Sequence, residues 1–112
     1  MGQLPRERRI TTRREITALL RASRARGPAL ALYRAPATGP LARATCITPK
    51  HGHTGVERNR LRRRIKELMR EVLLSKGETH DWLVRTRPPA YDLGFSALAA
   101  DLRSLAAELE GP

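Results

Sequence analysis

The sequence predicts an α/β fold, a two-layer sandwich in which helices pack against one small central sheet. Three observations predict it. Apolar residues recur three and four positions apart in three segments, which is the spacing of one helix face. Three other short apolar segments are bounded by Pro- and Gly-containing turns, as strands are. The length of 112 residues suits one domain with a modest core, over residues 1–112. The predicted order is α-β-β-α-β-α.

The N-terminal segment is predicted as a basic arm followed by a helix. Residues 1–9 contain arginines without apolar periodicity and are expected to be flexible. Thr12 and Glu15 have the spacing of a capping box, so the first helix begins there. Its apolar face consists of Ile16, Leu19 and Leu20.

Two strands and a loop come next. Gly27-Pro28 ends the first helical segment, and residues 29–33 suit a first strand. A turn rich in Pro and Gly, 35–40, separates it from a second strand over 43–48. Residues 49–55 form a loop with two glycines and two histidines.

The longest predicted helix covers residues 55–75. Thr54 and Glu57 again have capping-box spacing, and Gly77 is a plausible stop. Its apolar stripe consists of Leu61, Ile65, Leu68 and Val72, with Met69 and Leu73 at the edge.

The chain is predicted to end with a strand and a helix. Trp82-Leu83-Val84 fits a third strand, and Arg87-Pro88-Pro89 stops it because proline cannot extend a ladder. A third amphipathic helix follows. Its apolar face consists of Phe95, Leu98, Leu102, Leu105 and Leu109.

The composition is strongly basic. Lys and Arg number 22 against 11 Asp and Glu, a net charge of +11. Residues 1–76 carry +14 and residues 77–112 carry −3. Such a charge predicts a polyanionic partner, above all a nucleic acid. Because the chain has no membrane-length apolar run, no apolar signal core and one cysteine, we expect a cytoplasmic protein without a membrane partner.

Most of this charge falls on the longest helix. Residues 58–70 hold seven basic side chains, which Glu67 and Glu71 cannot balance. The apolar stripe occupies one side of the helix, and the basic residues, Arg70 among them, occupy its flanks and back. Arginine forks match phosphate oxygens, and the free N–H groups of a first helical turn also favour an anion. The helix is therefore predicted to bury its leucines on the sheet and to bind a polyanion.

Arg58-Asn59-Arg60, at the start of a basic amphipathic helix, resembles the signature of the bacterial ribonuclease P protein subunit. The flanking segments agree with that family. Residues 43–56 take the place of its second central strand and the stretch before the signature, 81–88 resembles its strand ending in Arg-x-Pro, and 4–20 resembles its opening helix. The likeness covers nearly the whole chain, and the order of the segments makes it more specific than the signature alone.

The resemblance implies a protein cofactor for a catalytic RNA that removes the 5′ leader of precursor tRNA. The implied partners are ribonuclease P RNA and precursor tRNA, with Mg²⁺ held mainly by the RNA and no catalytic residue on the protein. It also implies a left-handed βαβ crossover, where a right-handed one would otherwise be expected. The signature-helix positions that would face the RNA, with the metal in the vicinity of Asn59, are Arg58, Asn59, Arg60, Arg62, Arg63 and Lys66.

The resemblance places a leader cleft between the first helix and the sheet. The matching positions are Ile16, Leu20, Tyr33, Ile47, Thr48 and Lys50. The family often has phenylalanine at the two helix positions, and base–aromatic stacking contributes about 1–3 kcal/mol per base. Pro49 and His51 also replace the usual Ser and Lys. We therefore expect weaker or altered leader contact.

Other functions fit less of the sequence. A structural RNA-binding protein of the ribosomal type would carry a similar charge and stays open as an alternative. The strand and loop signals before residue 55 disfavour a helix-turn-helix protein, so no DNA partner is expected. His51 and His53 lack a third ligand nearby, which favours a phosphate-adjacent loop over a zinc site. Cys46 is predicted to be a buried apolar residue.

Overall fold

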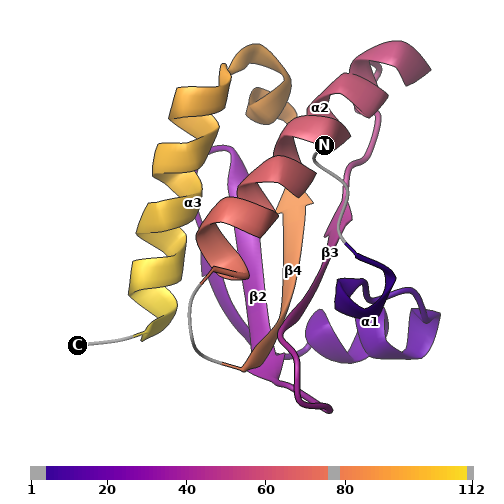
Figure 1. Ribbon diagram of the computed structural model, residues 1–112. Coiled ribbons are helices and arrows are strands. Elements are labelled where there is room, and N and C mark those ends of the chain that lie inside the picture. The colour runs from indigo at the N-terminus through magenta and orange to yellow at the C-terminus, as the bar shows by residue number, and fades with distance from the viewer. Residues whose placement is uncertain (1–4, 76–78, 111–112) are drawn as a thin grey trace.

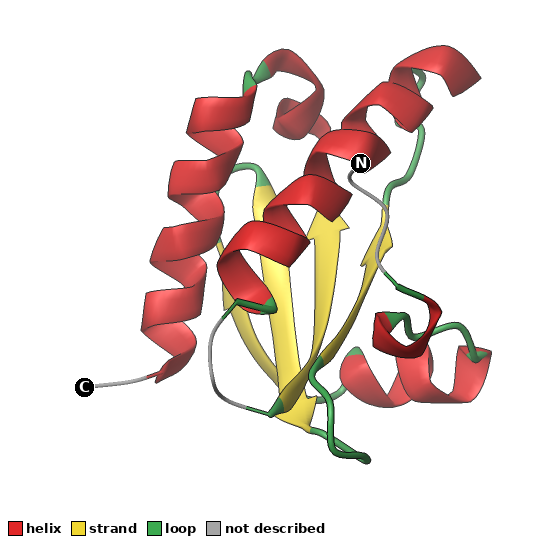
Figure 2. Ribbon diagram, in the orientation of Figure 1, coloured by secondary structure: helices red, strands yellow, loops and turns green. Residues whose placement is uncertain are grey.

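A four-stranded mixed sheet organises the computed structural model, which describes residues 5–75 and 79–110 (Figures 1 and 2). β1, β2 and β4 are antiparallel neighbours, and β3 runs parallel to β4 at one edge. The strands, in their order across the sheet, are β1 (Ser23–Arg26), β2 (Leu30–Pro36), β4 (His80–Thr86) and β3 (Arg43–Ile47). The predicted α/β class is confirmed, with one strand more than expected.

The additional strand is β1. Its sequence, Ser-Arg-Ala-Arg, has no apolar run, and only Ala25 is buried. Edge position explains this composition, because an edge strand pairs on one side only and β1 pairs with β2 alone. The element order is therefore α-β-β-β-α-β-α.

Two helices cover one face of the sheet, and a short helix lies against the other (Figure 1). Alternation along β2 separates the faces: Leu30 and Leu32 point toward the large core, and Ala31 and Tyr33 toward the smaller one. α2 (Gly55–Leu68) and α3 (Phe95–Glu110) pack on the first face, and α1 (Arg13–Leu19) on the second. None of the helices in the described residues is long and apolar enough to span a bilayer.

The crossover from β3 through α2 to β4 is left-handed. Figure 1 views the sheet from the side of α2, with β3 and β4 pointing upward. The chain rises along β3, returns through α2 in front, and rises again along β4 to the left of β3. A right-handed crossover would move to the right. The uncommon hand is the one that the family resemblance implies.

The predicted apolar stripe of the long helix is buried. Each member is at most 6% exposed, and the set is Leu61, Ile65, Leu68, Met69, Val72 and Leu73. The helix is not uniformly α-helical over 55–75. It changes to a π-helix over Met69–Leu73, where Leu74 N donates to Met69 O, five residues back. Gly77, the predicted stop, lies outside the described residues.

Part of the predicted arm over 1–9 has regular structure and contacts the sheet. Residues 1–4 lie outside the described residues. Arg6–Arg8 form a 3-10 helix, and Arg9 forms a parallel bridge with Ala44 of β3. Arg8 Nε donates to Ala42 O at 2.5 Å. These backbone and side-chain contacts hold the segment against the sheet edge, a tertiary effect that periodicity does not reveal.

Candidate RNA-binding interface

The start of α2 is fixed by a complete capping box. Thr54 Oγ1 accepts from Glu57 N at 3.1 Å, and the Glu57 carboxylate accepts from Thr54 N at 2.9 Å. The hydrogen bond from Thr54 N, with a further contact from His53, holds the pKa of Glu57 below its usual value. Because α2 begins at Gly55, the signature Arg58-Asn59-Arg60 falls in its first two turns. The capping box therefore determines where the signature side chains emerge.

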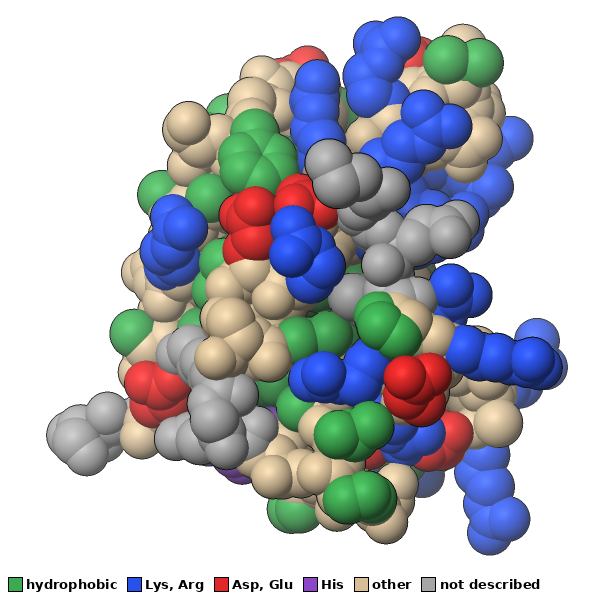
Figure 3. Space-filling view, viewed as in Figure 1, with side chains coloured by type: hydrophobic (Ala, Val, Ile, Leu, Met, Phe, Trp, Pro, Cys, Tyr) green, Lys and Arg blue, Asp and Glu red, His purple; other side chains and the backbone are tan. Residues whose placement is uncertain are grey.

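The basic side chains of α2 lie opposite its buried stripe. Figure 3 shows Lys and Arg side chains gathered over this helix. The exposed members of the predicted RNA-binding set are Asn59, Arg60, Arg63 and Arg70, and the half-buried members are Arg58, Arg62 and Lys66. The helix thus brings all seven predicted residues onto its flanks and outer side, as its periodicity predicts.

One of these cations is neutralised within the helix. Arg70 forms an ion pair with Glu67 and lies 3.8 Å from Glu71. The hydrogen bond to Arg70 lowers the pKa of Glu67. Among the described residues, no ion pair involves the other five basic members of the set, Arg58, Arg60, Arg62, Arg63 and Lys66. Their charge is therefore available to phosphate, whereas Arg70 would first have to leave its carboxylate.

A groove of about 300 Å³ extends the basic surface beyond α2. It lies between the N-terminal segment, β3 and α2, and its basic side chains are Arg9, Arg62 and Lys66. Cys46, predicted to be a buried apolar residue, lines the groove too; it packs against the larger core and is half-buried. Desolvation raises the pKa of the Cys46 thiol, although the two cations of α2 oppose the shift. The thiol is therefore mostly protonated near neutral pH.

The loop before α2 is packed against a tyrosine. His53 stacks on the Tyr91 ring, with centroids 3.9 Å apart and planes 7° from parallel. The Tyr91 hydroxyl donates to Pro49 O at 2.6 Å, and His51 adopts a positive φ of 48°. These contacts fix the chain that leads into the signature turn.

The predicted leader cleft is only partly assembled. Ile16, Tyr33 and Ile47 do meet on the α1 face of the sheet, in the smaller core. Leu20 lies outside that core and is 36% exposed. Thr48 is buried, and it follows Cys46 in the alternation that points toward α2, whereas Lys50 is exposed. Three of the six residues thus share the α1 face of the sheet, and Thr48 lies in the alternation of the opposite face.

A basic groove beside Tyr33 was missed by sequence reasoning. Its volume is about 200 Å³, and its basic and histidine side chains are Arg26, Arg85, Arg87 and His51. Alternation along β4 offered a signal, because Arg85 lies two residues after Leu83 and shares its face. Arg26 gave none, since β1 itself was not predicted.

The surroundings of Asn59 do not form a Mg²⁺ site on their own. Its helix neighbours Arg58 and Arg60 are cationic, and the nearby Glu57 carboxylate is held by Thr54 and His53. In the part of the chain that the structure describes, no three His, Cys, Asp or Glu side chains gather as a metal site. Mg²⁺ keeps several waters and takes phosphate oxygens readily, so ligands there would have to come from RNA.

Comparison with known proteins agrees with this architecture. The chain resembles the ribonuclease P protein component of Kocuria rhizophila, with 36% identity over 70 residues, 62% of each protein. The fold matches that of the ribonuclease P protein of Staphylococcus aureus, with a TM-score of 0.80 and 19% identity over 91% of this chain and 94% of that one. The Thermotoga maritima protein gives a TM-score of 0.73 and 15% identity over 86% and 92%. The family model for ribonuclease P matches residues 4–110, so the chain belongs to the ribonuclease P protein family.

Proposed function

We propose that this chain is the protein subunit of a ribonuclease P holoenzyme, which assists a catalytic RNA in removing the 5′ leader from precursor tRNA. The observation that carries the proposal is the basic face of α2, which opens with Arg58-Asn59-Arg60 and is free of ion pairs from 58 to 66 within the described residues. Family membership adds the reaction to which this surface would contribute.

The protein contributes binding rather than bond cleavage. Exposed arginines on α2 would donate paired hydrogen bonds to phosphate oxygens of ribonuclease P RNA, and the first turn adds the positive end of the helix dipole. The groove lined by Arg9, Arg62 and Lys66 continues this surface toward β3. The RNA performs the hydrolysis with Mg²⁺, which RNA phosphates hold, and the protein's cations offset the repulsion between phosphates that approach one another. The holoenzyme would act in the cytoplasm.

The precursor tRNA leader is assigned to the opposite face of the sheet. The groove lined by Tyr33, Arg26 and Arg85 offers cations for the leader backbone and one aromatic side chain. Tyr33 is only 4% exposed, and the helix positions hold Ile16 and Leu20 in place of rings. Leader binding would therefore depend mainly on charge, with little stacking, and would be sensitive to salt.

A cleavage assay with the cognate ribonuclease P RNA tests the proposal. Precursor tRNA is incubated with the RNA at low Mg²⁺, with and without the protein. We expect the protein to stimulate cleavage and to have no activity by itself. Stimulation should weaken for Arg60→Ala and persist for Arg103→Ala, which removes the same charge at an exposed position of α3. No stimulation by the wild-type protein would reject the proposal and favour a structural RNA-binding protein.

A further inference from the structure

α1 borders the leader groove through Ile16, which belongs to the same apolar cluster as Tyr33, and its apolar anchor is small. It has seven residues, and Leu19 is the one that is fully buried. Ile16 is half-buried and packs on the smaller core with Tyr33 and Ile47. Figures 1 and 2 show that α1 lies apart from the layer formed by α2 and α3. Its position over the sheet therefore depends on contacts other than extensive burial.

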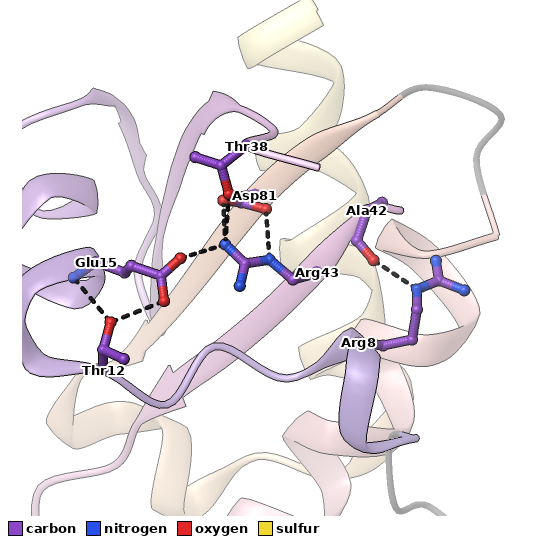
Figure 4. A network of polar contacts seen from close by, with 7 residues as sticks. All are labelled: Arg8, Thr12, Glu15, Thr38, Ala42, Arg43 and Asp81. Atoms are coloured by element: carbon purple, nitrogen blue, oxygen red, sulfur yellow. Dashed lines mark hydrogen bonds and ion pairs between the residues drawn. The ribbon is translucent and has the colours of Figure 1, made fainter. Parts of the chain in front are cut away.

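One arginine supplies a polar connection between α1 and the sheet (Figure 4). Arg43, the first residue of β3, binds Asp81 of β4 through two nitrogens, with Nε–Oδ1 at 3.3 Å and Nη2–Oδ2 at 2.9 Å. The same Nη2 donates to Glu15 of α1, and to Thr38 Oγ1 at 3.0 Å. The guanidinium thus joins α1, the β2–β3 turn and two strands.

The capping box that the sequence predicts at Thr12 and Glu15 is only half formed. Thr12 Oγ1 does accept from Glu15 N, at 3.3 Å. The Glu15 carboxylate, however, accepts from the Thr12 hydroxyl at 2.7 Å and from Arg43, instead of from the Thr12 backbone. The hydrogen bond from Arg43 is the largest cause that holds the pKa of Glu15 below its ordinary value. The half-formed cap is consistent with a role for Glu15 across the sheet.

The Arg43–Glu15 contact is not needed to neutralise a buried charge. Asp81 is 5% exposed and already forms a two-bond pair with Arg43. The Glu15 carboxylate is about one-third exposed, so its contribution to global stability is small. The contact instead restricts where α1 lies. Glu15 directly precedes Ile16, so holding the Glu15 side chain also holds Ile16 at its distance from Tyr33.

We propose that Arg43 is a positioning residue for precursor tRNA: through Glu15 it holds α1 at a set distance from the sheet, and so it fixes the place of Ile16 beside Tyr33 at the border of the leader groove. This inference rests on the proposed function, because it assigns the leader to that face. It makes Arg43 a determinant of leader affinity without contact to the leader itself, and it leaves the basic face of α2 untouched.

Glu15→Gln is the sharpest test, because it removes the charged partner on α1 and leaves the Arg43–Asp81 pair intact. The holoenzyme is assembled with cognate RNA, and its affinity is measured for tRNA with and without a leader. The ratio of the two affinities is the readout. Glu108→Gln, at an exposed position on α3, makes the same change in net charge and serves as the matched control. Thermal midpoints are recorded for all variants.

We expect Glu15→Gln to lower the affinity ratio about two- to fivefold, the range of one partly exposed ion pair, with affinity for leaderless tRNA unchanged. Glu108→Gln should keep the wild-type ratio. Arg43→Lys keeps a charge for Asp81 but lacks the fork that reaches both acids, so it should lower the ratio similarly. In that background Glu15→Gln should have no further effect.

Two results would overturn the inference while the proposed function stands. In one, the wild-type protein shows a leader-dependent gain and Glu15→Gln retains it. In the other, both affinities fall by the same factor, or only the thermal midpoint changes, which would mean that the contact is merely structural. If the wild-type holoenzyme shows no leader-dependent gain, the leader assignment itself fails, and the role of Arg43 fails with it.

Discussion

Replacing Gly27 by alanine tests how α3 is joined to the sheet. A Cβ at this position would lie 2.9 Å from Asp101 Cγ and closer still to Oδ1, inside van der Waals contact. Asp101 cannot turn away freely, because its Oδ2 accepts from Ala29 N at 3.2 Å and from Leu30 N at 3.0 Å. The alanine therefore displaces the carboxylate from two backbone donors.

The cost follows from those two donors. Ala29 and Leu30 are both 0% exposed, so water does not readily replace the lost acceptor. Each buried N–H left without its acceptor costs about 1–2 kcal/mol, which gives about 2–4 kcal/mol for Gly27→Ala. At about 4 °C per kcal/mol for a domain of this size, the thermal midpoint should fall by about 8–16 °C.

Urea and thermal unfolding measure this effect against Gly39→Ala, where a Cβ meets nothing within 4 Å. We expect the control to change stability by less than about 0.5 kcal/mol. In an Asp101→Ala background the clash is absent, and Gly27→Ala should cost about as little as the control. An equally large loss in that background would refute the reasoning, since the destabilisation could not then come from Asp101.

Three further predictions concern charge. Arg60→Ala combined with Arg63→Ala should reduce the slope of log affinity for ribonuclease P RNA against log salt by about 1.4–1.8, which filter binding over a salt series measures; an unchanged slope would mean that neither touches phosphate. Arg43 lowers the pKa of Glu15 in the folded state, so the ionised carboxylate stabilises the fold fully above the unfolded pKa near 4.5, and this stabilisation is lost as the pH falls through the folded pKa. Urea unfolding from pH 6 to 3 should therefore show a smaller decline in the free energy of unfolding for Glu15→Gln than for the wild-type protein. Burial raises the pKa of the Cys46 thiol above its ordinary value, so iodoacetamide should react more slowly with the native protein than with the urea-unfolded chain at pH 8, and equal rates would contradict this.

Periodicity predicted the buried side of the fold well, because burial in this chain follows one repeating pattern within each element. The stripe from Leu61 to Leu73 is buried as its spacing indicates. On the predicted apolar face of α3, Leu98, Leu102 and Leu105 are buried, whereas Phe95 at the start of the helix is 39% exposed. The sequence predicts the strand around Trp82, but the predicted strand is too short, because His80 and Asp81 at the start of β4 are polar. Their pairing with β2 and β3 supplies what propensity lacks.

Tertiary partners decided what the sequence alone could not predict. β1 has no apolar pattern and exists because β2 offers it an edge. Glu15 has capping-box spacing, yet Arg43, 28 residues away, competes for its carboxylate. Arg70, in the π-helical turn that follows α2, resembles the cations of α2 in sequence, but it is paired with Glu67. For β1 and Glu15, the partner is distant in the sequence, so the local pattern cannot show it. For Arg70, the sequence does not show which of several neighbouring arginines pairs with a carboxylate.

The loop of residues 49–54 connects the two candidate surfaces, which lie on opposite faces of the sheet. His53 packs on Tyr91 and contacts Glu57, which places it at the start of α2. His51, two residues earlier, lines the groove that holds Tyr33 and Arg85 on the α1 face. The loop therefore passes around one end of the sheet, and its contacts with the two basic surfaces are only two residues apart in the chain. An RNA bound at the signature turn and a leader bound beside Tyr33 would approach each other at this end of the sheet, and the arginines there would offset the repulsion between their phosphates.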